Sequence, residues 1–160
     1  GIKFDATKID RIINNLLKMN EGTIFLIVWC IVTAILIMIL YKRGKKALSI
    51  FPPIETVRVL YRDKSASGYS TKSFKTKIGG SSKTLEIVVT DKELWLTSKL
   101  LLASIGESHD LLHKIALDNI EQVERNGKKV TVNFKNDSGE AKQVVLWTKR
   151  IDDFIKVLNK

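Results

Sequence analysis

The longest apolar stretch of the chain covers residues 24–41, IFLIVWCIVTAILIMILY, and contains no charged side chain. A transmembrane helix needs an apolar run of about 18 or more residues. At a rise of about 1.5 Å per residue, this stretch reaches roughly 27 Å, which just crosses the hydrocarbon core of a bilayer. The pattern therefore predicts one transmembrane helix over residues 23–41.

The residues that flank this apolar stretch also fit a membrane anchor. A cleaved signal peptide and a buried helix of a soluble protein are the alternatives. The first is disfavoured because YKRGKK follows the stretch, where a signal peptide has small residues for cleavage. The second is disfavoured because so small a protein rarely buries a helix that is apolar on every side. The membrane-flanking residues are Tyr41, Lys42, Arg43, Lys45 and Lys46.

The four cations in this group set the expected orientation. Positive side chains collect in the cytoplasmic loops of membrane proteins. The charges before the stretch are mixed, with Lys18 offset by Glu21. We therefore expect a single-pass membrane protein whose C-terminal part lies in the cytoplasm.

Residues 1–22 have an apolar residue at every helical turn. We expect an amphipathic pre-membrane helix there, whose apolar face needs a lipid interface or a partner protein. The alternative is a plain continuation into the transmembrane helix. The apolar positions are Ile9, Ile12, Ile13, Leu16 and Leu17.

Beyond residue 53, short alternations of apolar and polar residues predict strands. Asn126-Gly127 is the strongest hairpin signal, because this pair suits a tight two-residue turn. Residues 64–70, KSASGYS, suggest a flexible stretch, and residues 70–78 form a weak, polar strand candidate. The expected strands cover residues 55–62, 70–78, 85–90, 94–102, 111–117, 120–124, 130–134 and 143–147.

The apolar spacing becomes helical again near the C-terminus, at Ile151, Phe154, Ile155 and Leu158. The expected fold class is therefore mainly β, with about seven antiparallel strands, a C-terminal α-helix and one N-terminal transmembrane helix. The expected domains are residues 1–22 (amphipathic helix), 23–41 (transmembrane helix), 42–53 (basic linker with two prolines) and 54–160 (strand-rich domain).

The strand pair LEIVVTDKELWLTS (85–98), the segment KIALDNIEQV (114–123), the hairpin after it and the closing helix occur in a characteristic order. This order resembles the pleckstrin-homology (PH)-like superfold, and GRAM and bacterial-type PH domains in particular, over residues 54–160. The resemblance implies a partly open barrel plugged by the terminal helix. It also implies a module that binds lipid headgroups or proteins and has no catalysis of its own. Phosphoinositide-binding members carry Lys/Arg-x-Arg in the second strand, whereas this chain offers Lys75-Thr76-Lys77.

The formal net charge of +10 comes mostly from residues after the apolar stretch. One basic segment of the C-terminal domain is a candidate surface for anionic lipid, and a generally basic, solubilising surface is the alternative. Nucleic acid is disfavoured, because no Arg-rich helix or aromatic ladder accompanies the charge. The candidate lipid-binding residues are Arg58, Arg62, Lys64, Lys72, Lys75, Lys77 and Lys83.

No pattern of catalytic or metal-binding residues stands out. His109 and His113 are four residues apart, but metal binding at that spacing needs a helix face, and we expect a turn and a strand. Residues 77–84 lack the Gly-Lys pair and the following helix of a phosphate-binding loop. Cys30 lies within the apolar stretch. We expect no enzyme, no cofactor and no metal site.

Other apolar side chains of the C-terminal domain have an expected structural role. We expect Trp95 and Trp147 in the core, and residues 100–103 (LLLA) either in the core or as a sticky rim for a partner. Together with the anchor, these features favour an accessory or scaffolding subunit of a membrane protein complex. The alternative is a membrane-anchored module that senses anionic lipid through a basic strand face.

Overall fold

The computed structural model describes residue 7 and residues 20–159, and the chain forms two compact units, residues 1–39 and 40–160. Helix α2 (Glu21–Leu48) begins after Asn20, whose Oδ1 accepts a hydrogen bond from the Thr23 amide at 2.8 Å. In the described part of the chain, α2 is the one helix long and apolar enough to cross a membrane. The expected amphipathic helix over residues 1–22 falls almost entirely outside the described residues.

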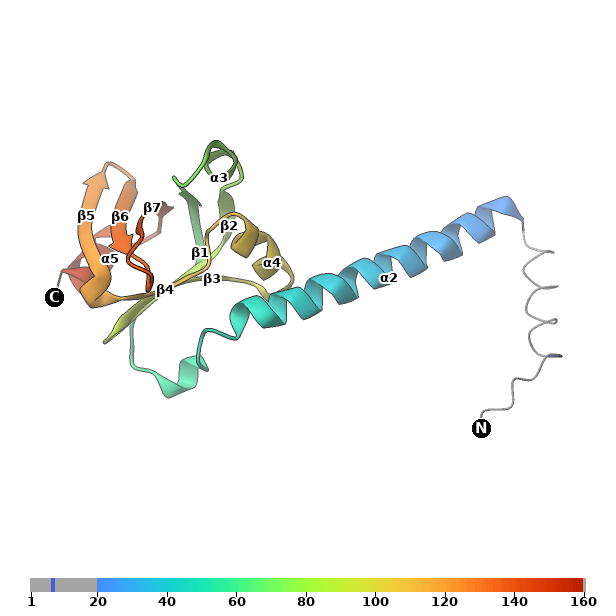
Figure 1. Ribbon diagram of the computed structural model, residues 1–160, viewed down its shortest axis with the longest axis horizontal. Coiled ribbons are helices and arrows are strands. Elements are labelled where there is room, and N and C mark those ends of the chain that lie inside the picture. Colours follow the sequence, from blue (N-terminus) through green and yellow to red (C-terminus); the bar gives the residue numbers. More distant parts are fainter. Residues whose placement is uncertain (1–6, 8–19, 160) are drawn as a thin grey trace. The chain divides into compact units, whose positions relative to one another are not determined.

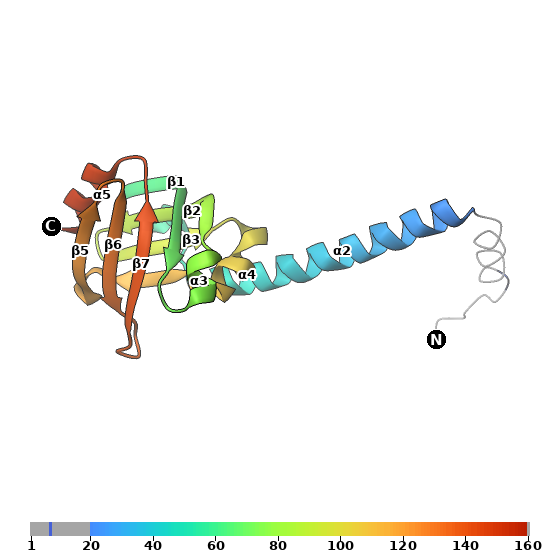
Figure 2. The ribbon, with the colours of Figure 1, turned by 90° about the horizontal axis from the view of Figure 1, so that it is seen from above.

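Seven antiparallel strands form one open sheet in the second unit, in the order β4-β3-β2-β1-β7-β6-β5. The sheet curls, so that β5–β7 cross over β1–β4 at a steep angle (Figures 1 and 2). The C-terminal helix follows β7, and the whole arrangement confirms the expected fold class and is compatible with a PH-like fold. The strands are β1 (Val59–Ser70), β2 (Ser81–Thr90), β3 (Glu93–Ser98), β4 (His113–Ala116), β5 (Ile120–Asn126), β6 (Lys129–Lys135) and β7 (Ala141–Trp147).

Short helices connect and cap these strands. Helices α3 and α4 lie beside each other at one end of the sheet, and α5 lies at the other end (Figures 1 and 2). The Asn126-Gly127 hairpin is confirmed, since β5 and β6 pair on either side of it and Gly127 adopts a φ of +59°. The helical segments of this unit, besides the end of α2, are η1 (Ile54–Thr56), α3 (Phe74–Ile78), α4 (Leu100–Ser108), η2 (Leu117–Asn119) and α5 (Ile151–Leu158).

Strand β1 corrects the sequence analysis at residues 64–78. The stretch that suggested flexibility is the second half of β1, and residues 74–78 are helical rather than a strand. Here β1 pairs with β7 through Ser67–Ser70, while its pairing with β2 continues irregularly at Ala66 and Gly68. A Cβ on Gly68 would lie only 2.9 Å from Leu146 Cδ2, so this crossing requires small residues. Helix α3 begins where Ser73 and Thr76 exchange hydrogen bonds between backbone and hydroxyl groups.

The expectation of a strand over residues 94–102 is wrong in its second half. Strand β3 ends at Ser98 and the leucine run opens α4. Leucine and alanine are strong helix formers, and Ala103 turns inward and is fully buried. The apolar run alone fits a strand or a helix, and the burial of the small Ala103 favours the helix.

The core lies between the two halves of the curled sheet and beneath α5. Phe154 of α5 is fully buried, and its ring lies 5.3 Å from the ring of Tyr61. Asp63 links β1 to the turn before α5, because its Oδ2 accepts hydrogen bonds from Thr148 Oγ1 at 2.7 Å and from the Lys149 amide at 2.9 Å. Burial raises the pKa of Asp63, but these bonds and those from Ser65 outweigh it and leave the pKa below its ordinary value.

Candidate functional site

The candidate lipid-binding residues do not share one strand face. Arg62, on β1, pairs with Glu86 of β2 at 2.6 Å. Lys77 belongs to α3 and lines a hollow with Ser67, and the backbone amide of Lys83 donates to Ser67 Oγ at 2.9 Å. The structure therefore brings Lys77 and Lys83 to a common neighbour while Arg62 has an acidic partner of its own.

The other basic candidates are spread between the residues before β1 and helix α3. Arg58 lies before β1, Lys64 is exposed on β1, and Lys72 lies between β1 and α3. Lys72 lines a separate polar hollow that also contains acidic residues. The side chain of Lys75 lies outside the described residues.

A polar cluster around Asp110 links three strands of the sheet. Asp110 accepts hydrogen bonds from Lys142 Nζ at 2.6 Å and from Ser70 Oγ at 2.9 Å, and its backbone carbonyl accepts from His113 Nε2 at 2.8 Å. These four residues come from β1, β4, β7 and the loop after α4, so the cluster ties three strands together. These hydrogen bonds link side chains from distant parts of the chain, which is the arrangement expected of a structural network.

Two groups of this cluster, Asp110 and His113, have pKa values below their ordinary values. Burial raises the pKa of Asp110, but the Lys142 hydrogen bond, the His113 charge and the Ser70 hydrogen bond together lower it below its ordinary value. Burial lowers the pKa of His113, and the opposing charge of Asp110 does not restore it. His113 is therefore held neutral near pH 7 with its ring 5.1 Å from the ring of Phe134.

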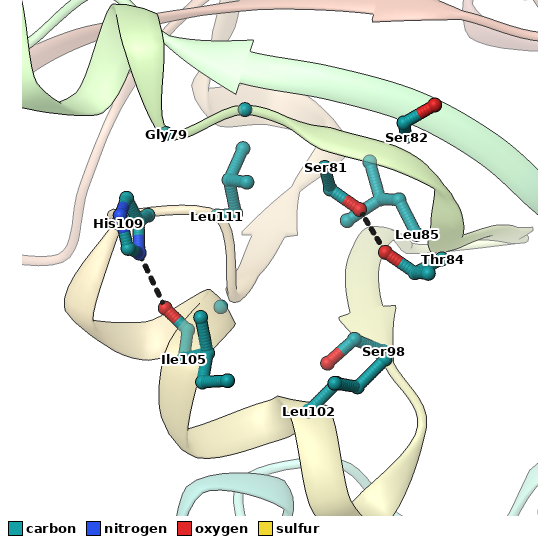
Figure 3. A pocket seen from close by; sticks show the side chains of 12 residues that line it. Gly79, Ser81, Ser82, Thr84, Leu85, Ser98, Leu102, Ile105, His109 and Leu111 are labelled. Atoms are coloured by element: carbon teal, nitrogen blue, oxygen red, sulfur yellow. Dashed lines mark hydrogen bonds between the residues drawn. The ribbon is translucent and has the colours of Figure 1, made fainter.

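An apolar cavity of about 260 Å³ lies between α4 and the start of β2 (Figure 3). Leu102 and Ile105 of α4 face Leu85 and Leu111 across it, and hydroxyl groups of the Ser81–Thr84 segment line its rim. Ser98 Oγ is buried at this cavity and has no hydrogen-bond partner within the described residues. The segment compared above with a phosphate-binding loop thus forms a wall of an apolar cavity, and a strand follows it.

A second hollow, of about 410 Å³, opens on the outer face of β1 and β7, and we call it the aromatic hollow. Tyr69 and Trp147 form its floor with ring centroids 5.6 Å apart, and Lys129 Nζ lies 5.3 Å from the centre of the Trp147 ring. Its outer rim includes the α3 residue Ile78, which is 70% exposed. The lining residues are Ser67, Gly68, Tyr69, Lys77, Ile78, Gly80, Ser81, Ser82 and Trp147.

The two tryptophans of the domain differ in burial, and His109 lies at the end of α4. Trp95 is buried, which confirms its expected core position, whereas Trp147 is only half-buried. His109 Nδ1 donates to the Ile105 carbonyl at 2.9 Å and caps the end of α4. Among the residues that the structure describes, no group of three or more His, Cys, Asp or Glu side chains is arranged to hold a metal ion.

A comparison with protein-family models gave no match to this chain, and neither did a comparison with curated proteins.

The aromatic hollow was missed in the sequence because its parts are far apart along the chain. Tyr69 lies in the stretch that suggested flexibility, and Trp147 was expected in the core. The pairing of β1 with β7 brings them together, with Tyr69 opposite Val145 and Ser67 opposite Trp147. The available signal was the alternation VVLW before the last turn, which places Trp147 and Val145 on one face and Leu146 on the other.

Proposed function

We propose that this protein is a single-pass membrane protein whose cytoplasmic, PH-like domain is a non-catalytic accessory or scaffolding subunit of a membrane protein complex. The curled seven-stranded sheet with its terminal helix supports a PH-like binding module. The apolar helix α2 supports the anchor, and the basic residues in its last turns, after the apolar stretch, support the cytoplasmic side for the domain.

The aromatic hollow is the observation that carries this proposal. Protein–protein interfaces are enriched in tyrosine, tryptophan and arginine, and their strongest contacts gather in preformed hollows. The tilted rings of Tyr69 and Trp147 contact each other at such a hollow, and the apolar Ile78 is exposed at its rim. An aromatic floor, an apolar rim and a nearby cation fit a partner segment with one apolar anchor and an acidic flank.

The test is purification of the tagged full-length protein from native membranes in mild detergent, followed by mass spectrometry of the proteins that co-elute. We expect a stoichiometric companion that is lost with Ile78→Glu. The matched control is Leu60→Glu, because Leu60 is 38% exposed at the opposite end of β1. A protein that elutes without a companion, or a companion that tolerates Ile78→Glu as well as Leu60→Glu, would contradict the proposal.

The second candidate function is a membrane-anchored module that senses anionic lipid. It is favoured by α3, where Phe74 is 80% exposed beside the exposed Lys72 and Lys77. Apolar tips flanked by lysines enter anionic membrane surfaces, and each basic residue near the surface contributes about 1 kcal/mol. For this second function we therefore propose a lipid site on α3 and the residues that flank it, rather than on a strand face.

Liposome binding tests this second function. Removal of two charges by Lys75→Ala with Lys77→Ala should weaken association with vesicles that contain phosphatidylglycerol. Removal of two other positive charges by Lys128→Ala with Lys135→Ala, both on the β5–β6 hairpin, should weaken this association much less. Equal losses in both double variants would indicate general charge attraction and exclude a site on α3.

A further inference from the structure

The apolar cavity between α4 and the start of β2 has an inner and an outer wall that differ in exposure (Figure 3). Leu85 and Leu111 are each 1% exposed, belong to the hydrophobic core and form the inner wall. Leu102 and Ile105 of α4 are 36% and 47% exposed and form the outer wall. The cavity is therefore open to solvent on the α4 side and ends against the core.

Ser98, the last residue of β3, has a buried hydroxyl group at this cavity. The residue is 8% exposed, and its Oγ is the one buried side-chain polar atom without a hydrogen-bond partner among the described residues. Figure 3 shows this oxygen turned toward the space between the lining side chains. A Cβ at position 106 would lie 3.4 Å from it, so Gly106 keeps α4 from covering the hydroxyl. Because a buried hydroxyl without a partner is costly, a group in the cavity that bonds to it is stabilised there.

The lining offers no charged Lys, Arg, Asp or Glu side chain to a ligand, and all twelve lining residues lie in the described part of the chain. Ser81 Oγ and Thr84 Oγ1 already bond to each other at 2.5 Å, and His109 Nδ1 bonds to the Ile105 carbonyl at 2.9 Å. An ionised ligand would lose its hydration here without gaining an opposite charge. The cavity therefore favours an uncharged ligand.

The volume of the cavity sets the size of that ligand. A protein cavity of about 150 Å³ with apolar walls holds a benzene molecule. By the same ratio, the 260 Å³ of this cavity accommodate about ten heavy atoms. A buried water needs about two to four polar partners, and the four leucine and isoleucine side chains of the walls offer none. An apolar molecule with one polar group fits these walls better than water does.

We propose that the cavity binds an uncharged, mainly apolar small molecule of about ten heavy atoms, whose single hydroxyl group bonds to Ser98 Oγ. A hydroxyl suits this position because it can donate to the serine oxygen or accept from it. The apolar part of the ligand would contact the leucine and isoleucine walls. Straight-chain alcohols such as 1-octanol have this chemistry and serve as probes.

This site is separate from the aromatic hollow, with which it shares only residues 80–82 of its lining. The aromatic hollow is assigned above to a protein partner, whereas the cavity would take a small molecule. The inference does not rest on the proposed function, and its test uses no protein partner.

Photoaffinity labelling of the full chain in phosphatidylcholine vesicles tests the proposal. The probe is 1-octanol that carries a diazirine, and mass spectrometry of peptides locates the label. At a saturating probe concentration, an about tenfold excess of plain 1-octanol should lower the label in residues 98–111 about tenfold, by competition for one site. Label in residues 23–41 reports probe dissolved in the lipid and serves as the internal reference. Octanoate, compared at equal free aqueous concentration, should compete at least about tenfold less well because it is charged.

Two adjacent leucines of α4 provide matched variants. Leu102→Trp adds bulk inside the cavity and should abolish the label that 1-octanol displaces. Leu101→Trp makes the same exchange at a residue that is 46% exposed and is not part of the lining, and it should keep that label. Equal labelling of the two variants, or label in residues 98–111 that 1-octanol does not displace, would overturn the proposal.

Ser98→Ala tests the hydroxyl contact and decides the matter if Leu102→Trp fails to fold. The concentration of 1-octanol needed for displacement should rise about 2–10-fold, the loss expected for one hydrogen bond. The melting temperature of the free variant should not fall, because the removed hydroxyl has no partner within the described residues. Thr97→Ala, at the neighbouring residue of β3, is the control and should leave displacement unchanged. A lower melting temperature with unchanged displacement would show that Ser98 serves only the fold and would overturn the proposed contact.

Discussion

Helices α4 and α5 lie at opposite ends of the same sheet and are of nearly equal length, but they use their apolar residues in opposite ways (Figure 2). In α5 the apolar side faces the core, and Phe154 is fully buried against Tyr61. In α4 only Ala103 is fully buried, and Leu101, Leu102 and Ile105 each stay 36% to 47% exposed. Each helix has five apolar residues, but those of α5 complete the core, whereas the leucine-rich α4 keeps large apolar side chains exposed.

The difference shows that apolar content alone does not identify core residues. Full burial of a large apolar side chain stabilises a fold by about 1.5–3 kcal/mol, whereas an exposed one contributes little. In α4 the close contacts are made by small residues: Gly44 of α2 lies against the Leu100 carbonyl, and Ala103 is fully buried. Three changes to the protein or its solvent should therefore affect the two ends of the sheet differently.

The largest effect is expected from truncation of one apolar side chain in each helix. Phe154→Ala should lower the free energy of unfolding by about 3–5 kcal/mol, because it leaves a cavity under α5. Leu101→Ala should change it by no more than about 0.5 kcal/mol, because this side chain is 46% exposed and lines no described cavity. Denaturant unfolding of both variants in the same detergent measures the two free energies. A loss for Leu101→Ala as large as that for Phe154→Ala would show that the outer side of α4 is part of the core.

A smaller effect is expected at the contact between α2 and α4. Gly44→Ala adds a methyl group where the Leu100 carbonyl lies, and overpacking of this kind costs about 1–3 kcal/mol. Hydrogen exchange should rise at the α4 amides and stay unchanged in α5. Gly22→Ala is the control on the same helix, because its Cβ would meet only the Asn20 side chain at 3.7 Å. Unchanged α4 exchange in the Gly44 variant would refute the tight contact.

The smallest effect is expected from mild acid, at the α4 end of the domain. The folded structure lowers the pKa of His113, so the unfolded chain binds more protons and stability falls as the pH drops below about 6.5. The slope is at most about 1.4 kcal/mol per pH unit for one proton. Asp110, whose pKa is also lowered, adds no further loss until the pH approaches about 3.9. The groups around His113 are Asp110, Lys142 and Lys72.

Melting temperatures of the full chain in detergent between neutral and mildly acidic pH measure this slope. His113→Gln should flatten it, and His109→Gln, which removes the other histidine, should leave it intact. A slope that survives His113→Gln would assign the acid response to other groups.

Much of the fold was predictable because the local pattern and the final structure agree. The alternation in residues 85–98 and 120–147 gave most of the sheet, and the spacing of Ile151, Phe154 and Leu158 gave α5. The second half of β1 was missed because its small polar residues suggest a loop, and its pairing with the distant strand β7 is not visible in the local pattern. Helix α4 was missed because a short leucine run fits a strand or a helix equally well.

The candidate sites were less predictable than the fold, because they depend on contacts between distant residues. Tyr69 and Trp147 meet only through the pairing of β1 with β7, and Asp110 meets Lys142 only through the curl of the sheet. The basic residues were visible in the sequence, but their partners were not, as the pair of Arg62 with Glu86 illustrates. The boundaries of the four expected domains stay predictions.

The most direct test of the account compares two variants in one assay. The account assigns the aromatic hollow to a protein partner, so a charge at the rim of the hollow should remove the partner, and the same charge at the opposite end of β1 should not. We predict that Ile78→Glu loses the companion recovered from native membranes and that Leu60→Glu keeps it. Loss of the companion in both variants, or in neither, would contradict the assignment of the aromatic hollow to a partner.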